Sequence, residues 1–138
     1  KKPVLFFTSK TTKVEDAWKD FLVYARKKLA FLTEESVHVL VRTNHVRIKL
    51  ERNKPNNFEV MTIHKSKGLE FDNVIVFGIA EHLMPHRDND LDEEVRILYV
   101  ALTRARHFLG FVGWEKSDGT QRSAFLEPLV HHAKLVYI

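Results

Sequence analysis

The sequence predicts a single α/β domain, residues 1–138, built on a mostly parallel β-sheet with helices on both faces. Short apolar or β-branched runs alternate with helix-like segments along the chain, and this alternation is typical of parallel strands joined by crossovers. Residues 74–77 (VIVF) are apolar throughout, as expected for a central strand that is buried on both sides. The length of 138 residues suits one compact domain.

The first half of the chain predicts three strands and two helices. Apolar residues recur at helical spacing from Val14 to Leu29, with charged residues between them, which predicts an amphipathic helix that covers a sheet. Trp18 lies on this apolar stripe, so we expect it in the core. Asn44 is suited to cap a short second helix that ends near Arg52. The strands are predicted at residues 3–7, 36–41 and 58–63, with a turn at 53–57.

The second half predicts three more strands and a long helix. We expect this helix from about Leu91 to Arg106, because residues 92–94 are acidic and suit the positive end of a helix dipole, whereas Arg104 and Arg106 suit its other end. Glu93 and Arg96 are expected to pair on its surface. Its predicted apolar stripe consists of Val95, Leu98, Tyr99, Leu102 and Ala105. The other elements are predicted as strands at 74–77, 108–114 and 135–138, a turn at 117–119 and a helix at 123–132.

The charge of the chain is unevenly distributed. The net charge is +4, but residues 1–69 hold 15 basic against 7 acidic side chains, and residues 70–138 hold 7 against 11. A basic half favours a polyanionic partner, although a solvated lysine-rich surface gives the same composition. Cysteine is absent, which excludes disulfide partners and thiolate metal sites and is compatible with the cytoplasm, where we expect the protein. No apolar run approaches the length of a membrane span, so no membrane partner is expected.

The segment 62–70 has the composition of a phosphate-binding turn. It follows a predicted strand and combines small polar side chains with two lysines and Gly68, where the backbone can approach a ligand closely. A basic, solvated turn is the alternative that composition leaves open. The segment is not a P-loop, because the spacing GxxxxGK[ST] occurs nowhere in the chain.

Two segments resemble motifs of a known family. Residues 62–74 (TIHKSKGLEFDNV) resemble motif V, and residues 93–106 (EEVRILYVALTRAR) resemble motif VI, of superfamily 1 DNA helicases of the UvrD/Rep type. Residues 39–44 look like the strand and turn before the 2B insertion of that family, and residues 123–126 look like its tail helix. The resemblance implies that the chain is the second, C-terminal RecA-like domain of such a helicase, also called 2A.

The resemblance also implies roles for individual residues. Arg104, near the end of motif VI, matches the arginine finger that reaches the γ-phosphate of ATP and would be the catalytic residue. This role suits a planar, permanently charged guanidinium. Gly68 and Glu70 match the positions beside the bound nucleotide. The resemblance assigns contacts with single-stranded DNA to Thr62, His64 and Arg42.

The expected cofactor is ATP with Mg²⁺. In the family, the P-loop and the Mg²⁺ ligands belong to an N-terminal RecA-like domain, so we expect that domain before residue 1 of a longer parent protein, as a partner together with single-stranded DNA. The present chain by itself is expected neither to hydrolyse ATP nor to unwind DNA. No metal site is expected in it: residues 88–92 (DNDLD) begin like an EF-hand loop, but Glu93 stands where that loop requires glycine.

Two further expectations concern the parent protein. Only about a dozen residues separate Asn44 from Phe58, so the large 2B insertion of UvrD and Rep is absent from this position. The alternative function is a helicase-like nucleic-acid-binding or scaffolding module without ATPase activity. A P-loop upstream of this chain would favour the motor, and its absence would favour the scaffold.

Overall fold

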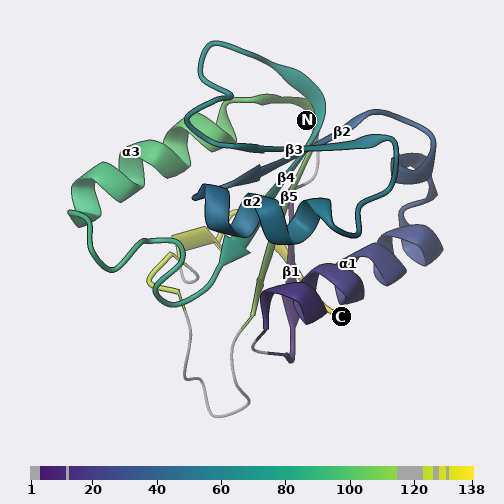
Figure 1. The fold of residues 1–138 in the computed structure, drawn as a ribbon, viewed down its shortest axis with the longest axis horizontal. Helices are drawn as coiled ribbons and strands as arrows, with labels where there is room; N and C mark the ends of the chain where they lie inside the picture. Colours follow the sequence, from purple (N-terminus) through teal and green to yellow (C-terminus); the bar gives the residue numbers. More distant parts are fainter. Residues whose placement is uncertain (1–3, 12, 115–122, 126–127, 130) are drawn as a thin grey trace.

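The computed structural model describes residues 4–11, 13–114, 123–125, 128–129 and 131–138. The described residues form a six-stranded sheet in the order β3-β2-β4-β5-β1-β6 (Figure 1). Every adjacent pair of strands runs parallel, which confirms the predicted α/β class. The strands are β1 (Val4–Ser9), β2 (Val37–Val41), β3 (Phe58–Thr62), β4 (Phe71–Ile79), β5 (Ala105–Trp114) and β6 (Lys134–Tyr137).

Helices cover both faces of the sheet, as predicted. Helices α1 (Val14–Lys28) and α2 (Asn44–Glu51) pack on one face, and α3 (Leu91–Leu102) packs on the other (Figure 1). Each face has its own apolar core, because the side chains of a strand alternate between the two sides. In β2, for example, Val39 points towards α1 and α2, whereas Leu40 points towards α3.

The first two helices follow the sequence pattern with small differences. Trp18 of α1 is buried and stacks on Phe21, with 6.1 Å between ring centroids, which confirms its core role. A 3₁₀ helix, η1 (Ala30–Thr33), follows α1 and was not predicted. The cap of α2 is Thr43 rather than Asn44: the hydroxyl of Thr43 accepts a hydrogen bond from the backbone N–H of Val46 at 3.4 Å.

Helix α3 ends earlier than predicted. We expected it to continue to Arg106, but it ends at Leu102, and β5 starts at Ala105. The carbonyl of Arg104 accepts a hydrogen bond from the N–H of Phe71 at 2.8 Å, so this stretch of backbone is already part of the sheet. Arg106 therefore lies in β5, where it pairs with Asp72 at 2.8 Å, and is not a helix C-terminal cation.

The buried face of α3 also differs from the predicted one. Tyr99 and Val95 were expected in the core but are 66% and 50% exposed. The buried residues of the helix are Glu94, Ile97, Leu98 and Ala101. The predicted and the observed apolar faces both have helical spacing. The sequence favoured the wrong one because a carboxylate at position 94 is unexpected in a core unless it has a buried partner. Glu93 and Arg96 do pair on the exposed side, at 3.0 Å, as predicted.

Strands β4 and β5 approach each other closely where their register shifts. A side chain at Gly113 would bring a Cβ to 2.2 Å from the carbonyl oxygen of Ile79, so only glycine fits there. The predicted strand at 74–77 is longer at both ends, and the predicted strand at 135–138 is β6, paired with β1. The predicted turn at 117–119 and part of the predicted helix at 123–132 lie outside the described residues; residues 128–129 are helical.

Candidate functional site

A long crossover, residues 63–70, carries most of the residues to which function was assigned. It leaves the carboxyl end of β3 and enters the amino end of β4. Leu40 of β2 pairs with both Met61 and Val76, so Met61 lies level with a residue five positions beyond the start of β4. At ~3.3 Å per residue, the crossover spans roughly 16 Å along the strand direction.

Hydrogen bonds within the crossover hold its turn. The Ser66 side chain is buried, and its hydroxyl donates to the carbonyl of Ile63 at 2.6 Å. The hydroxyl of Thr62 accepts from the N–H of Lys65 at 3.3 Å, and the N–H of Leu69 donates to Ser66 at 2.9 Å. Gly68 has a φ of +83°, a conformation that favours glycine. No heavy atom lies within 4 Å of where its Cβ would be, so the backbone there is open to a ligand.

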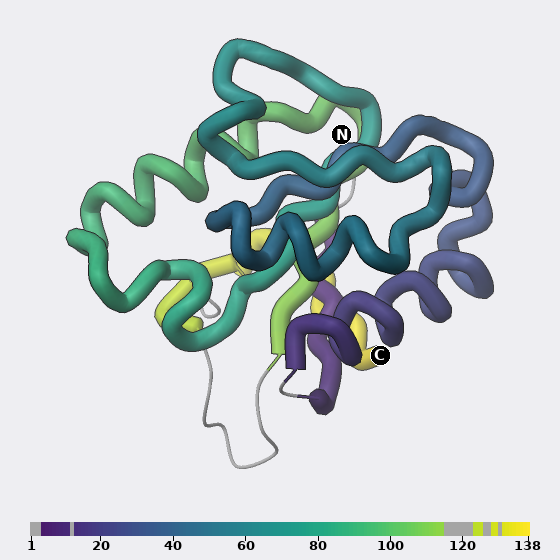
Figure 2. The backbone as a smooth tube through the Cα atoms, viewed as in Figure 1, coloured from purple at the N-terminus to yellow at the C-terminus, as the bar shows by residue number. Residues whose placement is uncertain are grey.

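Arg104 fastens the crossover to the end of α3. Its guanidinium donates to the carbonyls of Leu69 at 2.8 Å and Val100 at 3.1 Å, and to the hydroxyl of Thr103 at 3.0 Å. A longer contact, 3.4 Å, reaches the carbonyl of Ser66. Figure 2 shows the teal crossover beside the green segment that follows α3. Arg104 therefore contacts the turn at Ser66 and Leu69, and its guanidinium is held in one orientation.

The candidate residues divide between two edges of the sheet. Ligands of parallel sheets usually bind at the loops that follow the carboxyl ends of strands, but Arg104 immediately precedes β5 and lies at the amino-terminal edge. Gly68 and Glu70 flank Leu69, the residue that Arg104 bonds, just before β4, and both are exposed. Thr62 ends β3 at the opposite edge, with the exposed His64 after it. The residues assigned to ATP thus gather at one end of the crossover and those assigned to DNA at the other.

A cavity of about 300 Å³ lies between the crossover and α3. Cationic groups from both elements line it, namely Lys67 and Arg96, together with the ring of His64 and the carboxylate of Glu93. Glu93 is paired with Arg96, so Lys67 contributes an unbalanced positive charge. An anionic group such as a phosphate suits the positive charge of this cavity.

Arg42 and Glu94 form a buried ion pair that sequence reasoning missed. The guanidinium of Arg42 holds both carboxylate oxygens, with N–O distances of 2.8 to 3.1 Å, and the Glu94 side chain is fully buried. The same carboxylate accepts from the N–H of His86 and from the side-chain amide of Asn89, both at 2.7 Å. One carboxylate therefore ties the end of β2, the loop before α3 and α3 itself together.

The role of Glu94 could have been found in the sequence. Positions 94, 97, 98 and 101 have the spacing of one helical face. The face was not recognised because one of its four residues, Glu94, is acidic. We predicted a DNA contact for Arg42, but its side chain is only 16% exposed and is directed at Glu94. The contact of Arg42 with DNA stays a prediction. Its Nε and Nη2 bond Glu94, so Nη1 is the guanidinium nitrogen that could donate to a DNA phosphate.

The residue that starts β4 is held by an aromatic contact. The ring of His38 in β2 stacks on Phe71, with 3.7 Å between centroids and 12° between planes. Burial lowers the pKa of His38, and the nearby carboxylate of Glu59, 3.4 Å away, only partly opposes this effect. The ring of His38 therefore packs against Phe71, the residue that follows Glu70.

Comparison with known proteins places this arrangement in a family. Residues 14–116 match the family described as UvrD-like helicase C-terminal domain. The chain belongs to this family. The matched range includes both motif-like segments, the crossover and Arg104.

Named relatives agree with the family. The UvrD-like domain is 35% identical to the putative ATP-dependent DNA helicase YjcD of Bacillus subtilis, in an alignment that covers 91% of the chain. It is 38% identical over 47% of the chain to the ATP-dependent DNA helicase Rep of Buchnera aphidicola, and 42% identical over 43% to PcrA of Staphylococcus epidermidis. The chain spans 18% of the length of YjcD, 10% of Rep and 9% of PcrA.

The described part of the UvrD-like domain offers neither a cluster of metal ligands nor a membrane-spanning helix. Among the described residues, no three His, Asp or Glu side chains gather in a way that could hold a metal ion. The loop that begins like an EF-hand instead directs Asn89 at Glu94. In the same part of the chain, no helix is both long and apolar enough to span a membrane.

The buried carboxylate makes the stability of the UvrD-like domain depend on pH. Burial by itself would raise the pKa of Glu94, but hydrogen bonds from Arg42, from the N–H of His86 and from Asn89 outweigh it and lower the pKa from 4.5 to about 2. Because the folded pKa is below the unfolded one, ionised Glu94 stabilises the fold above about pH 4.5, and this stabilisation is lost as the pH falls towards 2.

We therefore expect Glu94→Gln to remove an acid-sensitive part of the free energy of unfolding. The ionisation of Glu94 contributes about 3 kcal/mol at pH 6, of which roughly 2 kcal/mol is lost by pH 3. Urea unfolding of the wild type and the variant across this range measures the difference. A gap between them that stays constant from pH 6 to pH 3 would show that the pKa of Glu94 is not lowered.

Proposed function

We propose that this chain is the C-terminal motor domain of an ATP-dependent DNA helicase or translocase, and that it supplies the arginine finger and part of the track for single-stranded DNA. The observation that carries the proposal is the direct bonding of Arg104 to the crossover at Leu69. One eight-residue segment, 63–70, thereby connects the residues assigned to ATP with those assigned to DNA. The names of YjcD, Rep and PcrA support the same activity.

In the proposed site, Arg104 faces the γ-phosphate of ATP bound to the N-terminal domain of the parent. Its guanidinium is pre-oriented, since Nε, Nη1 and Nη2 each have a partner within the domain, and a fixed donor needs little reorganisation when charge develops on the phosphate. Nη1 and Nη2 each carry two protons, so the bond to Thr103 leaves Nη2 a donor for the phosphate. Gly68 and Glu70 would contact the nucleotide from the adjoining backbone.

The residues present fit the anionic end of ATP, and they do not include a Mg²⁺ site. The described residues offer a guanidinium and an open glycine backbone, whereas the ligands for Mg²⁺ are expected from the N-terminal domain. When bound, Mg²⁺ neutralises charge on the phosphates. The chain itself would orient the γ-phosphate and transmit its presence through Leu69 to the rest of the crossover.

At the other end of the crossover, Thr62 and His64 would contact the phosphates of a single DNA strand. A shift of Arg104 on ATP binding or hydrolysis would pull on the carbonyls of Leu69 and Ser66, and the short, internally bonded crossover would pass the movement to His64. The grip on DNA would then alternate with the nucleotide state. We expect the motor to work in the cytoplasm.

The test is the coupling between DNA and ATP turnover in the full-length parent protein. We expect Thr62→Ala/His64→Ala to raise the concentration of single-stranded DNA that half-maximally stimulates ATP hydrolysis by about tenfold or more, since two phosphate contacts are lost. Turnover at saturating DNA should change much less. Lys65→Ala, exposed in the same crossover, is the matched control. A parent that hydrolyses no ATP under any condition would favour the scaffolding module instead.

A further inference from the structure

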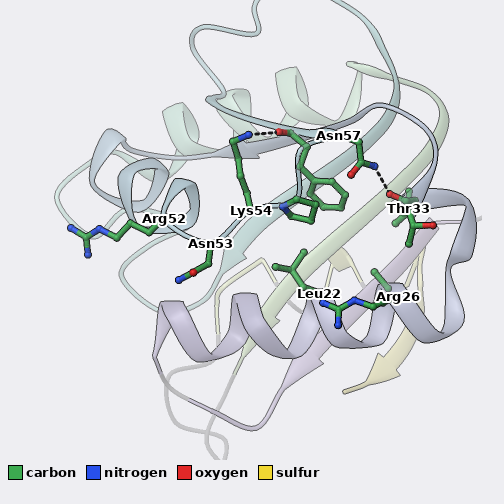
Figure 3. A pocket seen from close by; sticks show the side chains of 11 residues that line it. Leu22, Arg26, Thr33, Arg52, Asn53, Lys54 and Asn57 are labelled. Atoms are coloured by element: carbon green, nitrogen blue, oxygen red, sulfur yellow. Dashed lines mark hydrogen bonds between the residues drawn. The ribbon is translucent and has the colours of Figure 1, made fainter.

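A continuous groove runs along α1, on the face of the sheet opposite α3. It consists of two adjoining cavities of about 640 and 530 Å³, which share Leu22, Arg26 and Asn53 in their linings. The groove lies between α1 on one side and α2 with the turn at 52–57 on the other (Figure 3). From Glu15 to Arg26 it follows eleven residues of helix, or about 16 Å. None of the residues assigned to ATP or DNA above lines it.

The larger cavity has an apolar floor and polar edges. Its volume lies within the range of ordinary ligand sites. Polar groups at its edges are Thr33, Asn53 and Asn57, and the side-chain amide of Asn57 is already engaged with the carbonyl of Leu32 at 2.7 Å. The floor is formed by Leu22, Ala25, Leu32, Pro55 and Phe58.

The groove is strongly positive. The larger cavity contains no carboxylate among its lining residues. In the smaller one, Glu15 is partly neutralised by Lys49, 4.0 Å away, and Asp16 accepts a hydrogen bond from Thr11. Together the two cavities are lined by five cations against these two acids: Lys19, Arg26, Lys49, Arg52 and Lys54.

The cations of the larger cavity have capacity for a ligand. Figure 3 shows Arg26 reaching from α1 and Lys54 from the turn on facing sides of the cavity, while Arg52 extends outward from its end. Lys54 donates to the carbonyl of Phe58 at 2.8 Å, and an ammonium group has three protons, so two remain. Arg26 and Arg52 are exposed. These positions allow successive anionic groups to be bound along the groove.

We propose that this groove binds a second strand of nucleic acid through its phosphates. A row of cations beside an apolar floor suits a ligand in which phosphates alternate with flat, largely apolar bases. The strand would be a different one from that at Thr62 and His64, because the groove lies on the α1 and α2 face and the crossover packs on the α3 face. An acidic peptide would satisfy the charge but would not place flat bases on the apolar floor.

The test uses the full-length parent protein and a forked DNA with two unpaired arms. The variant Arg26→Gln/Arg52→Gln/Lys54→Gln removes the cations of the larger cavity. Each phosphate contact to a single strand contributes about 0.7 to the slope of log affinity against log salt concentration, so we expect the slope to fall by about 2. The matched control is Lys13→Gln/Lys27→Gln/Lys28→Gln, which removes the same charge from exposed positions at the ends of α1 that do not line the groove.

The outcomes separate this proposal from the proposed motor function. The concentration of single-stranded DNA that half-maximally stimulates ATP hydrolysis should be unchanged in the groove variant, whereas loss of Thr62 and His64 should raise it. Arg26→Gln/Arg52→Gln keeps the bond from Lys54 to Phe58 and should lower the slope by about 1.4 in a protein whose unfolding temperature is unchanged. Equal slopes in the groove variant and its control would overturn the proposal, as would tighter competition by an acidic peptide than by an unpaired DNA strand.

Discussion

Arg104→Ala should lower the turnover number for DNA-stimulated ATP hydrolysis in the full-length parent by about 10³-fold. The reason is that the guanidinium would no longer stabilise the charge on the transferring γ-phosphate, and arginine fingers of other nucleotide-hydrolysing enzymes contribute on this order. Arg104→Lys should recover little, since an ammonium group cannot reproduce a fork that binds Leu69, Val100 and the phosphate together. Steady-state kinetics with saturating DNA measures the effect.

Arg106→Ala is the matched control for this prediction. Arg106 lies two residues further along, and its guanidinium pairs with Asp72 on the surface at 2.8 Å, so its loss should change turnover less than twofold and hardly alter stability. Because Arg104 also holds the crossover, the unfolding temperature and the affinity for ATP of each variant must be measured. Turnover by Arg104→Ala within a few-fold of the wild type would remove the arginine from the catalytic role.

The second large effect is expected from Glu94→Ala, which should destabilise the domain by roughly 3–5 kcal/mol. The substitution leaves the largely buried guanidinium of Arg42 without its partner, and removal of one member of a buried pair has costs of this size. It also leaves the N–H of His86 and the amide of Asn89 without their acceptor. Urea unfolding at neutral pH measures the change.

Two comparisons show whether the buried pair causes this loss. Glu93→Ala removes the neighbouring carboxylate, which is 46% exposed and paired with Arg96, and should cost at most about 1 kcal/mol. The double variant Arg42→Met/Glu94→Leu replaces both charges by apolar groups and should recover much of the stability lost in Glu94→Ala. A double variant as unstable as the single one would mean that Glu94 acts through His86 and Asn89 rather than through Arg42.

The order of elements and the motif-bearing segments could be predicted from local sequence patterns. Apolar spacing identified α1 with its buried Trp18, and the uniformly apolar run 74–77 identified the centre of β4. The two motif-like segments identified the family, and they do so because their residue types and order are specific. Patterns of this kind report which side chains of one element face the core, and each element carries that information in its own residues.

Three features were decided only by the tertiary structure. The buried face of α3 includes Glu94 because Arg42, 52 positions earlier in the chain, directly follows β2 and bonds the carboxylate. Arg104 lies at the amino-terminal edge because α3 ends at Leu102 and the backbone of Arg104 bonds Phe71, a contact between segments more than thirty residues apart. The groove along α1 exists because the turn at 52–57 packs opposite that helix. Local periodicity contains no record of which distant segment will be the neighbour, and these contacts depend on the order of the strands in the sheet.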